Sequence, residues 1–130
     1  MLDSVEFVSD SLGIANGVIA TLTVQPERMR AALDMTMLAT DVAEWLVSQK
    51  GVPFREAHHI SGRIVALSEN TGVSMDQLTL EQLQAIDSRF TADIAAAFRY
   101  ESSVEAKSTP GGTSRSAVLG QIQELRAILD

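Results

Sequence analysis

The chain has 130 residues, enough for one small domain with a modest core. Its formal net charge is −7 and its ten lysines and arginines form no basic run, so neither a nucleic-acid partner nor an anionic membrane surface is expected. The absence of cysteine excludes disulfides, thiolate metal sites and cysteine nucleophiles, and it fits a predicted cytoplasmic location.

Residues 3–23 are predicted to form one long helix. Apolar side chains recur at steps of three and four along it, in a heptad-like seam of Val5, Val8, Leu12, Ala15, Ile19 and Leu22. A second stripe runs beside this seam, so the helix is expected to need partners on two sides. The helix is either the central core helix of a small bundle or an arm that packs against other subunits. We expect self-association through helix 3–23.

The same segment has the features of neither a secretory signal nor a membrane span. Asp3, Glu6 and Asp10 place negative charge where a signal peptide carries positive charge. The apolar stretch 12–24 is too short to cross a bilayer, and polar residues interrupt it. No membrane partner is therefore expected.

Three helices are predicted in the middle of the chain. Pro26 suits the first turn of a short helix over 27–33. A helix from about 38 to 50 follows, and Pro53 opens another that runs to about residue 71. Each of these two is followed by a glycine that can end it with left-handed backbone, Gly51 and Gly72. The residues expected to be buried in the helix over 38–50 are Leu38, Val42, Trp45 and Leu46.

The C-terminal half is predicted to be helical as well. Thr79 and Gln82 have the spacing of a capping box for a helix over 80–86. Further helical segments are expected over 93–98 and 102–107. The loop 108–114 ends in a hydroxyl that caps the last helix, either Thr113 or Ser114. Because no alternating strand pattern occurs, the predicted fold is all-α, with a long N-terminal bundle helix followed by a small multi-helix domain.

The adjacent His58 and His59 are the first candidates for chemistry. Neighbouring residues on a helix point about 100° apart, so the two rings cannot easily share a ligand. His58 is expected in the core and His59 on a solvated charged face with Arg55 and Arg63. A Glu56–His59 pair has ligand spacing but lacks further ligands, so no metal site is predicted.

The other candidates also favour structural roles. A triad would need Asp41, His58 and a serine, but no Gly-x-Ser-x-Gly motif is present. The segment 111–114, with Arg115 beside it, could hold an anion at the helix start, but a glycine loop that caps the helix is the favoured interpretation. Trp45 and Phe54 are expected to pack together at the turn between their helices. No catalytic, cofactor-binding or metal residue is assigned.

Three stretches resemble the C-terminal domain of the argininosuccinate lyase family and its δ-crystallin relatives, within the fumarase/aspartase superfamily. They are Met37-Leu-Ala-Thr-Asp-Val-Ala43, Lys50-Gly-Val-Pro-Phe-Arg-Glu-Ala-His58, and Gly111-Gly-Thr113 followed by Val118 and Gln121-Ile122. The family usually has Glu where this chain has His59. The resemblance implies that residues 1–24 are the last helix of the central domain and that residues 25–130 are the helical C-terminal domain.

The resemblance implies a homotetrameric enzyme of arginine biosynthesis that splits argininosuccinate into arginine and fumarate by β-elimination. The family's catalytic loop, Gly-Ser-Ser-x-Met-Pro-Gln-Lys, and its upstream histidine motifs do not occur in these 130 residues. The first hypothesis is therefore a structural C-terminal portion that is inactive alone and assembles with itself or with full-length lyase chains. The alternatives are a stand-alone helical interaction module and a small enzyme or metal protein that uses His58 or His59.

Overall fold

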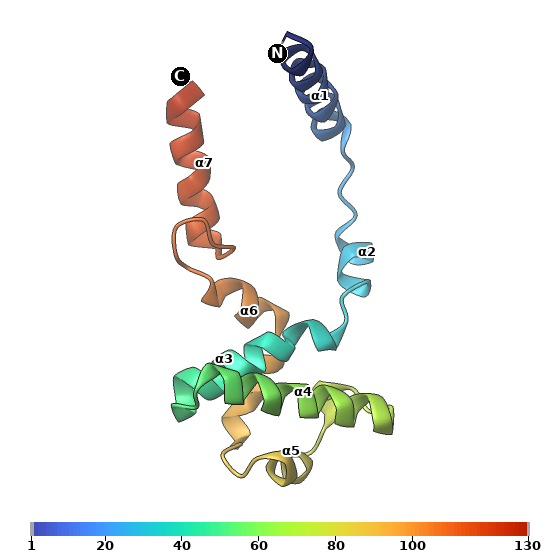
Figure 1. Cartoon of the computed structure of the whole chain (residues 1–130), viewed down its shortest axis with the longest axis vertical. Helices are drawn as coiled ribbons and strands as arrows, with labels where there is room; N and C mark the ends of the chain where they lie inside the picture. The colour runs from blue at the N-terminus through green and yellow to red at the C-terminus, as the bar shows by residue number, and fades with distance from the viewer. Residues whose placement is uncertain (1, 130) are drawn as a thin grey trace. The chain divides into compact units, whose positions relative to one another are not determined.

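The computed structural model describes residues 2–129, which form helices and loops without a strand, as Figure 1 shows. The predicted all-α class is confirmed. The chain divides into two compact units, residues up to Leu33 and residues from Asp34 onward. The predicted family-domain boundary between residues 24 and 25 stays a prediction. No helix in the described residues is both long and apolar enough to span a membrane.

The first unit contains α1 (Leu2–Thr21) and α2 (Pro26–Ala31). Helix α1 ends two residues before the predicted end, and Pro26 occupies the first turn of α2 as predicted. All side chains from Asp3 to Thr21 are exposed, and the large apolar ones of α1 are between 54% and 73% exposed. Because apolar residues recur on α1 at helical spacing, the unit leaves a broad apolar face uncovered.

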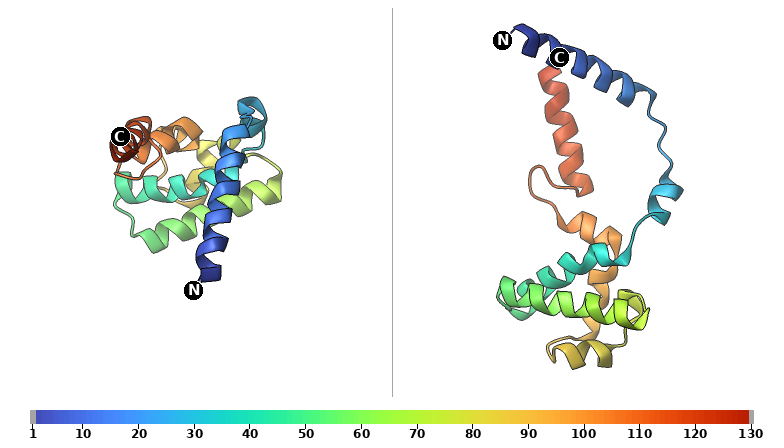
Figure 2. Two further views of the ribbon diagram at one scale, coloured as in Figure 1. Left: turned by 90° about the horizontal axis from the view of Figure 1, so that it is seen from above. Right: turned by 45° about the vertical axis from the view of Figure 1, so that its right-hand side comes forward.

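The second unit is built on two helices that lie side by side in Figures 1 and 2, α3 (Ala39–Lys50) and α4 (Phe54–Thr71). A short 3-10 turn, η1 (Met35–Leu38), leads into α3. Gly51 ends α3 with φ +66°, a left-handed conformation that glycine adopts without strain. Its N–H donates to the Val47 carbonyl at 3.1 Å. The left-handed glycine end is confirmed, and the sharp turn lets α4 return along α3.

Shorter elements complete the unit: η2 (Met75–Gln77), α5 (Leu80–Ile86), η3 (Ala92–Phe98), α6 (Tyr100–Ala106) and α7 (Arg115–Leu129). The capping box is confirmed, since the Thr79 N–H donates to Gln82 Oε1 at 2.8 Å and the Gln82 N–H to Thr79 Oγ1 at 3.2 Å. The helix predicted over 93–98 is a 3-10 helix, and the turn predicted over 102–107 is a helix that begins at Tyr100.

The core lies where α3 and α4 meet the following short elements. Its buried members are Val42, Ala43, Leu46, Val52, Ala57, Ile60, Ile64, Met75, Leu78, Leu83, Phe90 and Ile94. Phe90 belongs to no regular element, yet its side chain is completely buried. The loop before η3 therefore contributes a large aromatic side chain to the core, which helical periodicity does not predict.

The predicted burial of His58 is wrong. The buried positions of α4 are Ala57, Ile60, Ser61 and Ile64. His58 follows Ala57 and is turned about 100° further round the helix, away from that face. It is exposed, as is His59, for which exposure was predicted. The same rotation leaves Phe54 57% exposed.

The predicted packing of Trp45 against Phe54 is also wrong. The Trp45 ring stacks on the buried Phe90, with ring centroids 5.9 Å apart and planes 9° from parallel. The Lys50 ammonium lies 4.7 Å from the Trp45 ring centroid, an arrangement that a cation–π attraction favours. Phe54 instead has His58 as its ring neighbour, 6.3 Å away. Trp45 thus joins α3 to the loop that carries Phe90.

Candidate functional site

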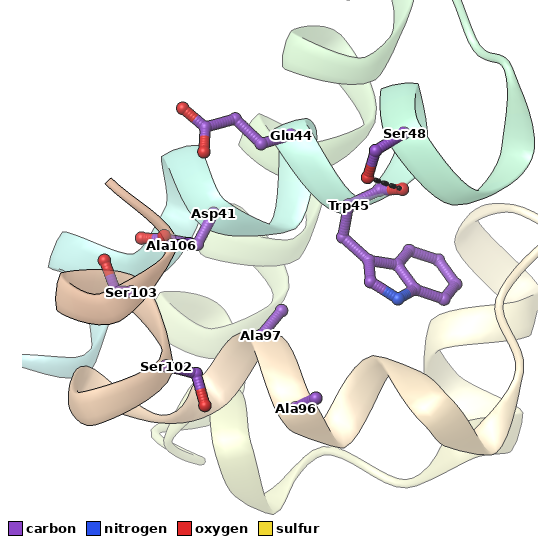
Figure 3. A pocket seen from close by; sticks show the side chains of 9 residues that line it. All are labelled: Asp41, Glu44, Trp45, Ser48, Ala96, Ala97, Ser102, Ser103 and Ala106. Carbon is purple, nitrogen blue, oxygen red and sulfur yellow. Dashed lines mark hydrogen bonds between the residues drawn. The ribbon is translucent and has the colours of Figure 1, made fainter. Parts of the chain in front are cut away.

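A cavity of about 210 Å³ opens between α3, η3 and α6. Figure 3 shows the side chains that line it. Helix α3 contributes Asp41, Glu44, Trp45 and Ser48. Small residues line the other side: Ala96 and Ala97 of η3, and Ser102, Ser103 and Ala106 of α6. The cavity thus brings two carboxylates, an indole and three serines together from three elements.

Lys107, directly after α6, engages both carboxylates of this cavity. Its Nζ lies 2.5 Å from Glu44 Oε2 and 3.4 Å from Asp41 Oδ1. The hydrogen bond from Lys107 to Glu44 is the main reason that the pKa of Lys107 is raised, and burial opposes it. The carboxylates are therefore held in ion pairs with Lys107, an arrangement that joins the end of α6 to α3.

A second charged cluster joins α4 to the loop after α5. Arg89 donates from Nη2 to Glu56 Oε1 at 2.5 Å and to Asp87 Oδ2 at 2.7 Å. Its Nε also donates to Asp87 Oδ1 at 2.8 Å. The hydrogen bond from the Arg89 side chain is the largest reason that the pKa of Asp87 is lowered. The Arg89 guanidinium thus binds two carboxylates at once. Its planar set of several N–H donors fits this arrangement better than a lysine ammonium would.

A wider groove of about 510 Å³ lies along α4 beside this cluster. It is lined by Pro53, Arg55, Glu56, His59, Ile60, Arg63 and Asp87. The solvated charged face that was predicted for α4 therefore lines a groove. Most of the lining side chains are charged, and Ile60 is an apolar residue among them.

The structure does not bring the predicted chemical candidates together. The Asp41 carboxylate pairs with Lys107, whereas the ring neighbours of His58 are Phe54 and His59. The Glu56 carboxylate accepts from Arg89. Within residues 2–129, no three His, Cys, Asp or Glu side chains gather in a group that could hold a metal ion. Neither a triad nor a metal centre is assembled in this part of the chain.

The glycine loop before α7 caps that helix. Of the two predicted caps, Ser114 is the one used: it is completely buried, and its Oγ accepts from the Ala117 N–H at 3.2 Å. Thr113 instead donates from Oγ1 to the Val104 carbonyl at 3.2 Å. The Arg115 N–H, which an anion could have used, donates to the Glu105 carboxylate at 3.3 Å. The local contacts therefore support the structural interpretation of this loop.

Sequence reasoning missed the residues that organise both charged clusters. Lys107 pairs with carboxylates 63 and 66 residues away, and Arg89 with one 33 residues away. No local spacing predicts such pairs. The one available signal was an Asp87-Ser-Arg89 step in a loop, where a carboxylate two residues from an arginine can close a local hydrogen-bonded turn.

Comparison with known proteins identifies the family. A family model described as argininosuccinate lyase C-terminal matches residues 36–105. The argininosuccinate lyase of Saccharomyces paradoxus is 54% identical over 131 residues, covering 100% of this chain and 28% of that enzyme. The enzyme of Candida albicans is 50% identical over 99% of this chain, which is 28% of its own length. That of Chlamydomonas reinhardtii is 46% identical over 99% of this chain and 27% of its length.

The chain thus spans about 28% of the length of these relatives and corresponds to their C-terminal part. The matched residues include α3, α4 and the core that surrounds them. Because the family model matches more than half of the 130 residues, the chain belongs to the argininosuccinate lyase C-terminal family.

Proposed function

We propose that this chain serves as the structural C-terminal portion of an argininosuccinate lyase and has no lyase activity alone. The observation that carries the proposal is the alignment of essentially the whole chain with only the C-terminal 28% of such enzymes. The side chains of the cavity support it as well, since both its carboxylates are paired with Lys107. A role in arginine biosynthesis and a cytoplasmic location are parts of the proposal, the latter resting on the cysteine-free sequence.

We expect no fumarate when the purified chain is mixed with argininosuccinate, at any chain concentration. We further expect activity from a chimera in which this chain replaces the matching C-terminal part of the Saccharomyces paradoxus enzyme, because the two are 54% identical there. Fumarate absorbance measures both reactions, and the intact yeast enzyme is the positive control. Fumarate release proportional to the isolated chain would contradict inactivity. A soluble chimera without activity would contradict the structural role.

The proposal includes assembly through α1, either with other copies or with full-length lyase chains, up to the homotetramer that the resemblance implies. The seam residues Val5, Val8, Leu12 and Ile19 are each more than half exposed. Burying an aliphatic side chain of this size contributes about 1.5–3 kcal/mol. The seam spans several helical turns, so pairing two such faces would bury several of these side chains at once.

Leu12→Asp is expected to lower the solution mass of the chain by disrupting this seam. Light scattering at micromolar concentration measures the mass. Glu6→Lys is the matched control, because it lies on the same helix outside the seam and changes the net charge by more than Leu12→Asp does. A monomeric mass for the original chain, unchanged in Leu12→Asp, would contradict self-association. Equal losses in both variants would show that the effect is not specific to the apolar seam.

A further inference from the structure

A row of cationic side chains follows one side of α4. Arg55, His59 and Arg63 recur every four residues, which places them one above another on the helix surface. They span about 12 Å along the axis, at 1.5 Å per residue. All three line the groove of about 510 Å³ described above. Two turns of α4 therefore present this row to a single concave surface.

The carboxylates of this groove are already engaged. Glu56 and Asp87 both accept hydrogen bonds from Arg89, and Asp87 is bound through both of its oxygens. Within residues 2–129, neither the Arg55 nor the Arg63 side chain forms a hydrogen bond or an ion pair. After the hydrogen bond from Arg89, the charge of Arg63 also contributes to the lowered pKa of Asp87. The guanidinium groups of Arg55, Arg63 and Arg89 face only the carboxylates of Glu56 and Asp87 here, so the groove is net positive in a chain whose acidic residues outnumber its basic ones by 17 to 10.

We propose that the groove along α4 binds a compact polyanion, a small molecule with two or more carboxylate or phosphate groups, through Arg55 and Arg63 on either side of His59. A guanidinium presents paired N–H donors that match the oxygens of a carboxylate or a phosphate. With a volume of about 510 Å³, the groove has the size of sites that hold small metabolites. His59 adds a ring N–H donor between the two arginines, and Ile60 contributes apolar contact.

Two probes test whether the groove prefers phosphate or carboxylate groups: sodium pyrophosphate represents phosphates and sodium citrate represents polycarboxylates. Each is titrated into the ¹⁵N-labelled full chain at constant ionic strength, and amide chemical shifts are followed by NMR. We expect saturable shifts that cluster at residues 54–63 and 87–89 for at least one probe. Their relative affinities assign the groove to phosphates or to carboxylates. Linear shifts scattered over the chain with both probes would overturn the proposal.

Replacement of the arginines tests the residues that carry the binding. Arg55→Gln and Arg63→Gln are each expected to weaken binding about fivefold to tenfold, as loss of a charge-assisted contact does. Arg126→Gln on α7 removes the same charge away from the groove and is expected to leave the affinity unchanged. If all three variants bound the probe equally weakly, the loss of affinity would come from the change in net charge alone. That result would overturn the proposal that Arg55 and Arg63 bind the anion. Thermal unfolding of each variant shows whether α4 remains intact.

Discussion

Phe90→Ala is expected to destabilise the second unit by about 3–5 kcal/mol, the cost of removing a large buried aromatic side chain. Phe90 is completely buried and stacks on Trp45 at 5.9 Å. Its loss would leave a cavity and remove the contact that joins α3 to the loop before η3. Since small domains are stable by only about 5–15 kcal/mol, much of the folded population would be lost on mild heating. Urea unfolding followed by circular dichroism measures the change.

Phe54→Ala is the matched control for this prediction. It deletes the same side chain from a position that is 57% exposed, at the start of α4. A loss of less than about 1 kcal/mol is expected, because surface substitutions cost little. Similar urea midpoints for the two variants would show that the loop aromatic does not belong to the core.

Gly112→Ala is expected to destabilise the loop before α7 by about 3 kcal/mol, near the upper end of what overpacking costs. An alanine Cβ at this position would lie 2.1 Å from the Lys107 carbonyl oxygen and 2.8 Å from that of Thr109. Both are backbone atoms, so relief requires the loop itself to move. Movement would disturb the hydrogen bond from the Ser114 N–H to the Lys107 carbonyl, 3.1 Å long, and with it the cap of α7. Hydrogen exchange of the α7 amides measures the effect.

Gly62→Ala provides a control of opposite sign. Gly62 lies within α4, and apart from its chain neighbours and the nearby backbone of α4 itself no atom lies within 4 Å of a Cβ added there. Alanine favours a helix interior over glycine by up to about 1 kcal/mol, so this variant is expected to be more stable. If both glycine variants shifted the unfolding midpoint in the same direction, the close approach at Gly112 would not be the cause.

Most helix boundaries were predictable because their signals are local. The Gly51 and Gly72 ends, the Thr79–Gln82 capping box and the proline starts each depend on neighbouring residues. The burial of single side chains was less predictable. His58 was assigned to the core from a helical repeat, yet the buried face of α4 is centred on Ala57, Ile60 and Ile64. A shift of one residue moves a side chain by about 100° and reverses its environment.

The partners in the two charged clusters were even less predictable from the sequence than side-chain burial. Arg89 and Lys107 each bind carboxylates from distant parts of the chain. Their partners depend on how α4 and α6 pack against the rest of the unit. The groove along α4 was predictable as a charged face, because Arg55, His59 and Arg63 recur at helical spacing. That Arg89 binds Glu56 and Asp87, and so leaves Arg55 and Arg63 without a hydrogen-bonded carboxylate, was not predictable.

The sequence by itself determined the all-α class, most helix ends and the family, because capping residues, periodicity and motifs are encoded in short stretches of chain. It also indicated that α1 carries a long apolar seam. Only the tertiary structure decided which side chains form the core, that a loop phenylalanine supports Trp45, and which carboxylates are already paired. These outcomes depend on contacts between residues far apart in the chain, and such contacts exist only once the helices have packed.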